Sequence, residues 1–178
     1  MTKKKEIMDE AALKRALTRL SYEIVEKHEN IKDIVLVGIK TRGIPTANIL
    51  ASNIENHTGV KVPICELDIT FYRDDLSTVA DMPRLKNSKF ETEIDKKDVI
   101  IADDVLYTGR TARAAIEAIF AQGRPNRIEL AVLVDRGHRE LPIRPDYIGK
   151  NIPTSQNEVV KVNFKEIDGQ TNVELYEK

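Results

Sequence analysis

Short apolar segments alternate with amphipathic segments along most of this chain, and this alternation limits the possible folds more than any other feature. Nearly continuous apolar runs, as expected of strands buried on both faces of a sheet, occupy residues 33–40, 97–105 and 127–135. Apolar positions with the period of a helix occur within residues 8–30, 44–59 and 109–123. Strands that alternate with helices predict an α/β fold with a mostly parallel central sheet flanked by helices.

Individual residues mark the ends of the first two predicted helices. Asp9 is placed to cap the first helix, Pro45 suits the first turn of the second, and Gly59 is a stop signal after it. The third predicted helix has an apolar stripe made of Ala112, Ala115, Ile116, Ile119 and Phe120.

The remaining segments carry weaker patterns. Residues 62–73 predict another strand, and residues 158–169 and 171–177 predict a closing antiparallel pair. Residues 136–153 look irregular. The polar stretch at about residues 73–92 has no period, and a loop of that length inside a compact domain is usually a lid or a disordered segment.

The composition excludes several classes of protein. With 178 residues, we expect a single domain spanning residues 1–178, and the net charge of −1 does not indicate a general nucleic-acid binder, although a local basic face would suffice. The single cysteine, Cys65, excludes an intrachain disulfide framework and a Cys-rich zinc site. Residues 1–10 lack the apolar core of a secretory signal, and no stretch approaches the roughly 20 apolar residues of a membrane span, so we expect a cytoplasmic protein.

The strongest chemical signal is the pair Asp103 and Asp104, which follows a buried apolar run. Like charges repel, so a cation or a group rich in hydroxyls should lie between them. Residues 108–111, TGRT, open the next predicted helix, and helix N-termini bind phosphate readily. Carboxylates suit the vicinal hydroxyls of a ribose or a hydrated magnesium ion. The alternative is an ordinary strand–loop–helix corner with two solvated acids.

Residues 99–111 resemble the phosphoribosyl pyrophosphate (PRPP) motif of type I phosphoribosyltransferases. The resemblance implies that the two acids hold the ribose hydroxyls and that residues 108–111 hold the 5′-phosphate. It also implies the type I fold, with a flexible active-site loop near residues 73–92 and a small hood near residues 136–178. The PRPP contacts implied within the motif are Asp103, Asp104, Val105, Leu106, Tyr107, Thr108, Gly109, Arg110 and Thr111.

Two other segments fit the same resemblance. Residues 38–43 lie where the family has its pyrophosphate-binding loop, and Lys40, Thr41 and Arg42 match its polar and cationic positions. The family often has a cis peptide bond in this loop, so we expect one between Lys40 and Thr41. The long polar loop would close over the site, with Arg73 or Arg84 reaching the pyrophosphate.

Residues 134–155, together with ALTRL, VGIKTRGI and EIDG elsewhere, are similar to one branch of the family, the bifunctional attenuation proteins of the pyrimidine operon. That branch would convert uracil and PRPP to UMP and pyrophosphate. The implied catalytic residues are Asp103, Asp104 and Arg42. The implied cofactor is Mg2+, which the two acids would meet mainly through PRPP and water. We expect the uracil pocket near Val134 to Arg136 and around Val159 and Val160.

The same branch implies an RNA-binding regulator. Such proteins bind a stem-loop of the leader mRNA of the pyrimidine operon and respond to UMP or UTP, with an RNA surface shared across a homo-oligomer, a dimer or a hexamer. Two basic clusters of this chain lie in the regions that such proteins use to bind RNA. The RNA-binding candidates are Lys14, Arg15, Thr18, Arg19, Tyr22, His138, Arg139, Arg144 and Lys150.

These residues also fit a role without RNA binding. A basic cluster is more often a solvated face than an RNA site. Tyr22 stands where relatives can carry histidine; it can stack on a base but cannot become cationic. His28 and His57, at predicted helix ends, are expected to be plain surface residues.

Two other functions remain open from sequence. One is a catalytically weak or inactive RNA-binding regulator that keeps the PRPP site as a nucleotide sensor. The other is a phosphoribosyltransferase for a purine base, against which the segment at residues 136–155 argues.

Overall fold

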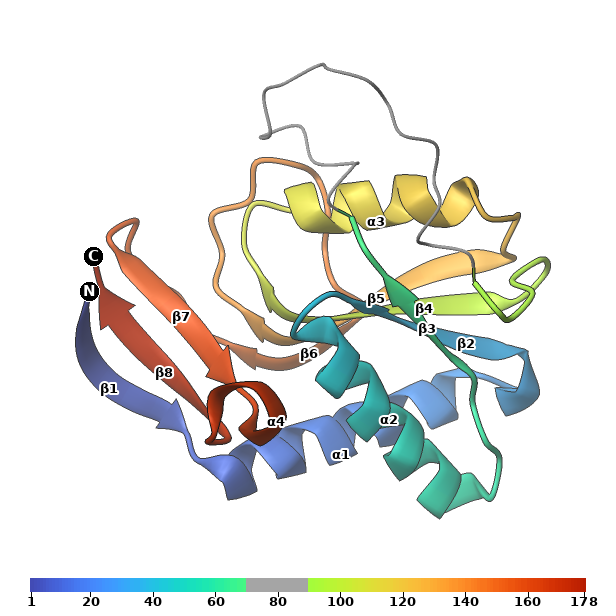
Figure 1. Cartoon of the computed structure of the whole chain (residues 1–178), viewed down its shortest axis with the longest axis horizontal. Coiled ribbons are helices and arrows are strands. Elements are labelled where there is room, and N and C mark those ends of the chain that lie inside the picture. The colour runs from blue at the N-terminus through green and yellow to red at the C-terminus, as the bar shows by residue number, and fades with distance from the viewer. Residues whose placement is uncertain (70–89) are drawn as a thin grey trace.

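The computed structural model describes residues 1–69 and 90–178. Within these ranges, the larger sheet has five parallel strands in the order β3-β2-β4-β5-β6 (Figure 1). These strands are β2 (Ile34–Ile39), β3 (Ile64–Leu67), β4 (Asp98–Leu106), β5 (Arg127–Asp135) and β6 (Tyr147–Asn151). The predicted α/β fold around a mostly parallel sheet is confirmed.

Helices cover both faces of this sheet (Figure 1). Helices α1 (Glu10–Lys27) and α2 (Gly43–Thr58) lie on one face, and α3 (Arg110–Phe120) lies on the other. Neighbouring strand residues alternate between the two layers: Leu36 packs in the core with α1 and α2, and Val37 packs in the core with α3. Because both faces are buried, the strands lack a polar side and have continuous apolar sequences.

The helix signals in the sequence act as expected. The Asp9 carboxylate accepts a hydrogen bond from the backbone N–H of Ala12 at 2.7 Å and caps α1. Pro45 lies in the first turn of α2, and Gly59 ends that helix with a φ of 73°. Between α1 and β2, the chain forms a short 3-10 helix, η1 (Ile31–Asp33).

A second, smaller sheet is antiparallel, with the order β1-β8-β7 (Figure 1). It contains β1 (Thr2–Met8), β7 (Glu158–Asn163) and β8 (Asn172–Glu177), and the short helix α4 (Lys165–Asp168) connects the last two. The predicted closing pair is confirmed. The predicted hood, residues 136–178, has the wrong bounds: β6 belongs to the large sheet, and β1 comes from the other end of the chain.

Polar contacts explain why β1 was missed. Most of β1 is exposed and lysine-rich, without the alternation that predicts a strand. Its side chains are held from β8: Lys3 pairs with Glu174, and Glu6 accepts a hydrogen bond from Asn172. Glu174 is only 2% exposed, so this strand is attached through a buried carboxylate rather than an apolar face.

Three local predictions need correction. Residues 136–153 were expected to be irregular but contain β6. The strand predicted over residues 62–73 is limited to β3, and the part beyond residue 69 lies outside the described residues. Phe120, placed in the apolar stripe of α3, is 58% exposed, because Ala114 and Ala118 take buried positions on that helix instead.

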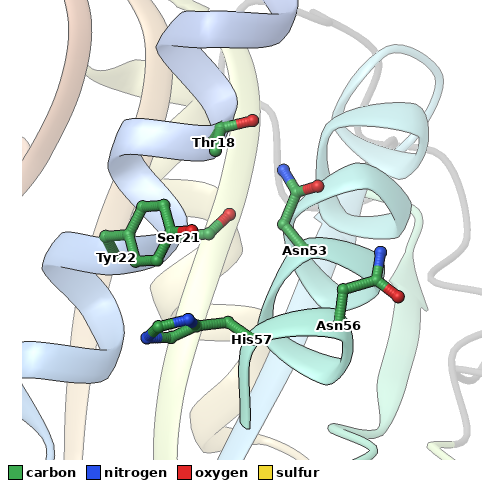
Figure 2. Close-up of a pocket in the computed structure, with 6 residues that line it drawn as sticks. All are labelled: Thr18, Ser21, Tyr22, Asn53, Asn56 and His57. Carbon is green, nitrogen blue, oxygen red and sulfur yellow. The ribbon is translucent and has the colours of Figure 1, made fainter. Parts of the chain in front are cut away.

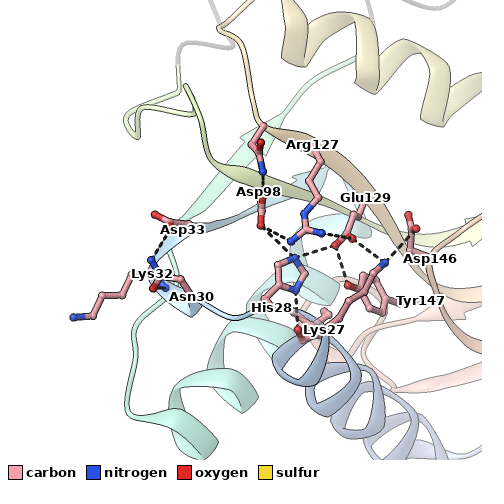
Figure 3. Close-up of polar contacts among 12 residues, drawn as sticks. Lys27, His28, Asn30, Lys32, Asp33, Asp98, Arg127, Glu129, Asp146 and Tyr147 are labelled. Carbon is pink, nitrogen blue, oxygen red and sulfur yellow. Dashed lines mark hydrogen bonds and ion pairs between the residues drawn. The ribbon is translucent and has the colours of Figure 1, made fainter.

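His28 is buried, so its prediction as a surface residue is wrong. It lies in a polar cluster at the amino-terminal edge of the large sheet, where α1 ends and β4 and β5 begin (Figure 3). Its Nδ1 is 2.8 Å from the carbonyl oxygen of Ile24, and its Nε2 is 3.1 Å from a carboxylate oxygen of Glu129. His57 is exposed, as predicted.

Among the described residues, we find no helix with the length and apolar character needed to cross a membrane.

Candidate active site

The carboxyl ends of β2, β4 and β5 meet at one edge of the large sheet. The strand register brings Gly38 beside Ala102, and Leu106 beside Asp135. The segments that leave these ends carry Lys40 to Arg42, Asp103 to Thr111, and Arg136 to Arg139. Ligands of open parallel sheets bind at this edge. The fold therefore brings the predicted PRPP and pyrophosphate segments together.

Asp103 and Asp104 are half-buried and lack a cationic hydrogen-bond partner within the described part of the chain. Asp103 accepts a hydrogen bond from the backbone N–H of Asp104 at 2.9 Å, and Asp104 accepts one from that of Val105 at 2.8 Å. Burial and the charge of Asp104 raise the pKa of Asp103 well above its ordinary value. Burial also raises the pKa of Asp104, although backbone hydrogen bonds and the charge of Arg42 oppose this shift. The pair can therefore receive hydroxyl donors or a cation.

The turn after the acids is shaped for an anion. Gly109 has a φ of 94°, which a side chain would strain, and it immediately precedes α3. No acidic residue lies in the first turn of α3, and the Thr108 hydroxyl accepts a hydrogen bond from the backbone N–H of Arg110 at 3.3 Å. Thr108 and Thr111 add hydroxyl groups to this turn, which fits the predicted phosphate site.

The segment after β5 holds this turn in place. The Arg139 guanidinium donates hydrogen bonds to the carbonyl oxygen of Tyr107 at 2.6 Å and to the carboxylate of Asp135. The backbone N–H of Glu140 donates to the carbonyl oxygen of Thr108 at 2.9 Å, and the Glu140 carboxylate pairs with Arg110. Sequence reasoning had assigned Arg139 to RNA binding and gave no signal for this positioning role.

The loop after β2, residues 40–43, is also fixed by contacts with its surroundings. The Lys40–Thr41 peptide bond is cis, as predicted. Gly43 permits close packing, since a Cβ there would lie 2.4 Å from the carbonyl oxygen of Ala102. Arg42 donates from Nε to the carbonyl oxygen of Val162 at 3.0 Å, and from Nη2 to Asp168 at 2.7 Å. The small sheet thus positions the predicted pyrophosphate arginine, a contact that the sequence analysis missed.

Two of the residues predicted near the base pocket, Arg136 and Val160, are buried and associated with β7. Arg136 is 6% exposed, donates to the carbonyl oxygen of Glu158 at 2.6 Å, and has its guanidinium 4.0 Å from the centre of the Tyr107 ring. Val160 is buried in β7. Arg136 therefore connects the PRPP turn to the small sheet. Arg73 and Arg84 lie outside the described residues.

Most of the first basic cluster forms an exposed face of α1. Lys14, Arg15 and Arg19 are exposed. They line a surface hollow together with Thr18, Tyr22, Glu23 and Glu26. Arg19 donates hydrogen bonds to the carbonyl oxygens of Ile148 and Gly149 at 2.9 and 2.7 Å, which places α1 against β6.

The second basic cluster is divided. Lys150 lies on β6, next to α1, and Arg144 is exposed in the preceding loop. His138 lies instead against the PRPP turn, with its Nε2 2.6 Å from the carbonyl oxygen of Thr154 and its ring edge-on to Tyr107. The structure therefore does not bring all the RNA-binding candidates to one face of the chain.

The acid pair fits a magnesium ion that arrives with a phosphorylated substrate. Among the described residues, no group of three or more acidic, histidine or cysteine side chains could by itself hold a metal. Magnesium often binds through one or two carboxylates together with waters and substrate phosphates. Asp103 and Asp104 would supply these two carboxylates to a magnesium ion bound with such a substrate.

Comparison with known proteins gives the family. Residues 3–166 match the phosphoribosyl transferase domain family. A relative from Clostridium perfringens, named Bifunctional protein PyrR, is 62% identical over 98% of both chains, and one of the same name from Clostridium acetobutylicum is 56% identical over 99% of both. The chain belongs to the PyrR family of phosphoribosyltransferases.

Solved structures agree on the fold. A hypoxanthine phosphoribosyltransferase from Staphylococcus aureus aligns with a TM-score of 0.72 over 99% of this chain and 93% of that one. It is 21% identical, so the similarity shows the type I fold and carries no argument about the base. The fold predicted for this PyrR-family chain is confirmed, together with its large parallel sheet and small antiparallel sheet.

Proposed function

We propose that the protein transfers the phosphoribosyl group of PRPP to uracil, and that it is also a UMP- and UTP-responsive RNA-binding regulator of pyrimidine operon attenuation. The observation that carries the enzymatic part is the Asp103–Asp104 pair, which has no cationic hydrogen-bond partner among the described residues and lies between the Arg42 loop and the turn that opens α3. The similarity to relatives named Bifunctional protein PyrR supports joining the two activities in one chain.

The proposed reaction exchanges one bond at ribose C1′. The bond from C1′ to the pyrophosphate oxygen breaks, and its electron pair leaves with pyrophosphate. The uracil N1 lone pair forms the new bond to C1′, and the N1 proton passes to solvent. Positive charge builds on the ribose between these events. Two carboxylates held beside the ribose would stabilise that charge, so catalysis is mainly alignment and electrostatics.

Each loop then has one part of PRPP to hold. Asp103 and Asp104 accept hydrogen bonds from the ribose hydroxyls, and residues 108–111 donate to the 5′-phosphate. Arg42, with Lys40 and Thr41, donates to the departing pyrophosphate, for which a guanidinium is well suited. A magnesium ion bound with PRPP would neutralise charge on the pyrophosphate. We place uracil near Arg136 and Val160.

The regulatory part uses the outer face of α1 and β6. Lys14, Arg15, Arg19 and Lys150 would contact RNA phosphates, while unpaired loop bases would supply specificity. We also expect the working form to be a homo-oligomer, either a dimer or a hexamer. Sedimentation equilibrium measures its mass and distinguishes the two.

A turnover assay tests the enzyme. The purified protein is mixed with PRPP, magnesium and either uracil or hypoxanthine, and the nucleotide product is measured with Asp104→Asn as the control. We expect UMP from uracil and no product from hypoxanthine. If UMP still binds and tightens leader-RNA binding but no UMP forms, the protein is a nucleotide sensor.

A matched pair of arginine variants tests RNA binding. Arg15 makes no ion pair among the described residues, whereas Arg19 also supports β6. We therefore expect Arg15→Ala to weaken leader-RNA binding and to leave UMP formation unchanged. Arg124→Ala removes an exposed arginine near the opposite face of the sheet and should change neither activity. Equal RNA affinity for wild type and Arg15→Ala would contradict the assignment.

A further inference from the structure

A polar cavity lies between α1 and α2, away from the candidate active site. It encloses about 280 Å³ and is lined by Thr18, Ser21, Tyr22, Asn53, Asn56 and His57 (Figure 2). Asn53 is ten residues beyond Gly43, where α2 begins beside the PRPP site, which is about 15 Å along the helix. The PRPP mechanism uses none of these six side chains.

Asn53 gives this cavity an unmet hydrogen-bonding need. Its amide nitrogen is buried and has no hydrogen-bond partner among the described residues. In Figure 2 the Asn53 amide lies across the cavity from Thr18. A buried donor without a partner is costly, and no hydrogen bond within residues 1–69 and 90–178 holds this amide nitrogen in its orientation. Rotation of the side chain can turn the donor toward a ligand.

Two rings form another wall of the cavity. Tyr22 and His57 pack edge to face, with their centres 4.4 Å apart and an angle of 78° between their planes. Tyr22 is nevertheless 49% exposed, so much of its ring is open to a flat partner. An aromatic face beside amide and hydroxyl groups is suited to an unstacked nucleobase, which presents one flat face and a polar edge.

The cavity continues into a charged hollow. Thr18 and Tyr22 line both spaces, and the second is also bordered by three cations and two carboxylates, Lys14, Arg15, Arg19, Glu23 and Glu26. Lys14 pairs with Glu10 and Arg19 with Glu23, whereas Arg15 makes no ion pair among the described residues. The cavity itself contains no lysine, arginine or carboxylate. A neutral polar cavity beside Arg15 and two exposed, ion-paired cations suits a nucleotide unit whose base enters the cavity while its phosphate contacts Arg15.

We propose that this α1–α2 cavity binds one unpaired base of the bound RNA, and that Asn53 selects adenine. The Asn53 amide offers one donor and one acceptor, which match N7 and the N6 amino group of adenine. The inference rests on the proposed RNA-binding function and adds to it a base-selective site on α2.

Two RNA hairpins with identical stems test the proposal, one with an all-adenine loop and one with an all-cytosine loop of equal length. Affinities are measured by fluorescence anisotropy. We expect wild type to bind the adenine loop about tenfold more tightly, and Asn53→Ala to lose that preference while keeping its affinity for the cytosine loop. Asn48→Ala changes the same residue type at an exposed position of α2 outside the cavity and should keep the preference.

Three further measurements separate the proposed contacts from a folding defect. Asn53→Asp keeps the side-chain shape but removes the donor, and it should also lose the adenine preference. UMP formation should remain unchanged in each Asn variant. A 2-aminopurine in the loop should lose fluorescence on binding wild type, through stacking on Tyr22, and should lose less on binding Tyr22→Ala.

The outcomes distinguish a failure of the cavity proposal from a failure of the proposed RNA-binding function. Equal affinity of wild type for both loops, or a retained adenine preference in both Asn53 variants, would overturn the cavity assignment while leaving RNA binding intact. Failure to bind the hairpins and the pyrimidine leader transcript would overturn RNA binding itself.

Discussion

Strand β4 carries carboxylates at both ends, and the protein treats the two ends in opposite ways. At its start, Asp98 accepts hydrogen bonds from Arg127 at 2.7 Å and from Asn126 at 2.8 Å (Figure 3). At its end, Asp103 and Asp104 accept hydrogen bonds from neighbouring backbone N–H groups only, among the contacts of the described residues.

The pKa directions follow this difference. Burial alone would raise the pKa of Asp98, but the hydrogen bonds from Arg127 and Asn126 lower it. Burial raises the pKa of Asp103 and of Asp104 without comparable compensation. The amino-terminal edge of the sheet satisfies its own charges and so contributes stability. The carboxyl-terminal edge keeps two carboxylates that have no cationic hydrogen-bond partner in the described part of the chain, which is the expected condition of a site completed by its ligand.

The largest expected difference is between Asp104→Asn and Asp98→Asn. Asp104→Asn should reduce the rate of UMP formation by about 10²–10³-fold, since charge beside the reacting ribose is lost, and should leave the melting temperature unchanged or higher. Asp98→Asn should do the reverse, lowering the melting temperature with little change in rate. Steady-state kinetics and calorimetry check both. A large loss of stability in Asp104→Asn would break the comparison.

A substitution of Glu129 tests more directly whether the paired carboxylates at the amino-terminal edge of the large sheet contribute stability. It is 5% exposed, and it accepts hydrogen bonds from Tyr147 at 2.9 Å and from Lys27 at 2.8 Å. Glu129→Gln should reduce the free energy of unfolding by about 2 kcal/mol, because buried donors lose a charged acceptor. Denaturant titration measures the change. Glu117→Gln, at a more exposed ion pair on α3, is the control and should change stability by less than about 0.5 kcal/mol.

The same cluster predicts a pH dependence. Burial alone would raise the pKa of Glu129, but the hydrogen bonds from Lys27 and Tyr147 lower it, and that of Asp98 is also lowered. Lowered carboxyl pKa values favour the folded state above the ordinary values near about 4, and this advantage is lost as the pH falls through the folded values. The stability gap between wild type and Glu129→Gln should therefore narrow in acid. Parallel stability curves would contradict this assignment.

The smallest expected effect concerns Asp168, which connects the small sheet to the functional edge. Asp168→Asn should loosen Arg42 and raise the KM for PRPP by roughly three- to tenfold, because one charge-assisted hydrogen bond is lost. The KM for uracil should not change. Glu166→Gln, an exposed acid on the same helix α4, should leave both constants as in wild type. Equal increases in both constants would indicate general damage to the small sheet.

The elements that sequence predicted best were those with local signals. The strands β2, β4 and β5 are continuous apolar runs, and α1 and α2 have caps or stops encoded by Asp9 and Gly59. Strand β1 has no such signal, since its side chains are held by a carboxylate on β8. Likewise, the periodicity of α3 placed Phe120 on the apolar stripe, but short alanines fill the buried face.

The candidate site divides in the same way. The acids, the TGRT turn and Lys40 to Arg42 were identified from sequence because each segment is contiguous and chemically distinctive. The links of Arg139 to Tyr107 and of Arg42 to Asp168 join residues 32 and 126 positions apart, and no local pattern signals such pairs.

The sequence by itself determined the α/β layers, the family resemblance and the chemistry available at the ends of the strands, because periodicity and motifs are local properties. Tertiary structure alone decided which charges are satisfied. It buried His28 beside Glu129, attached Arg42 to the small sheet, left Asp103 and Asp104 without a cationic hydrogen-bond partner among the described residues, and left the Asn53 amide nitrogen likewise unpartnered. The physical reason is that hydrogen bonding and removal from water depend on neighbours brought together only by the fold.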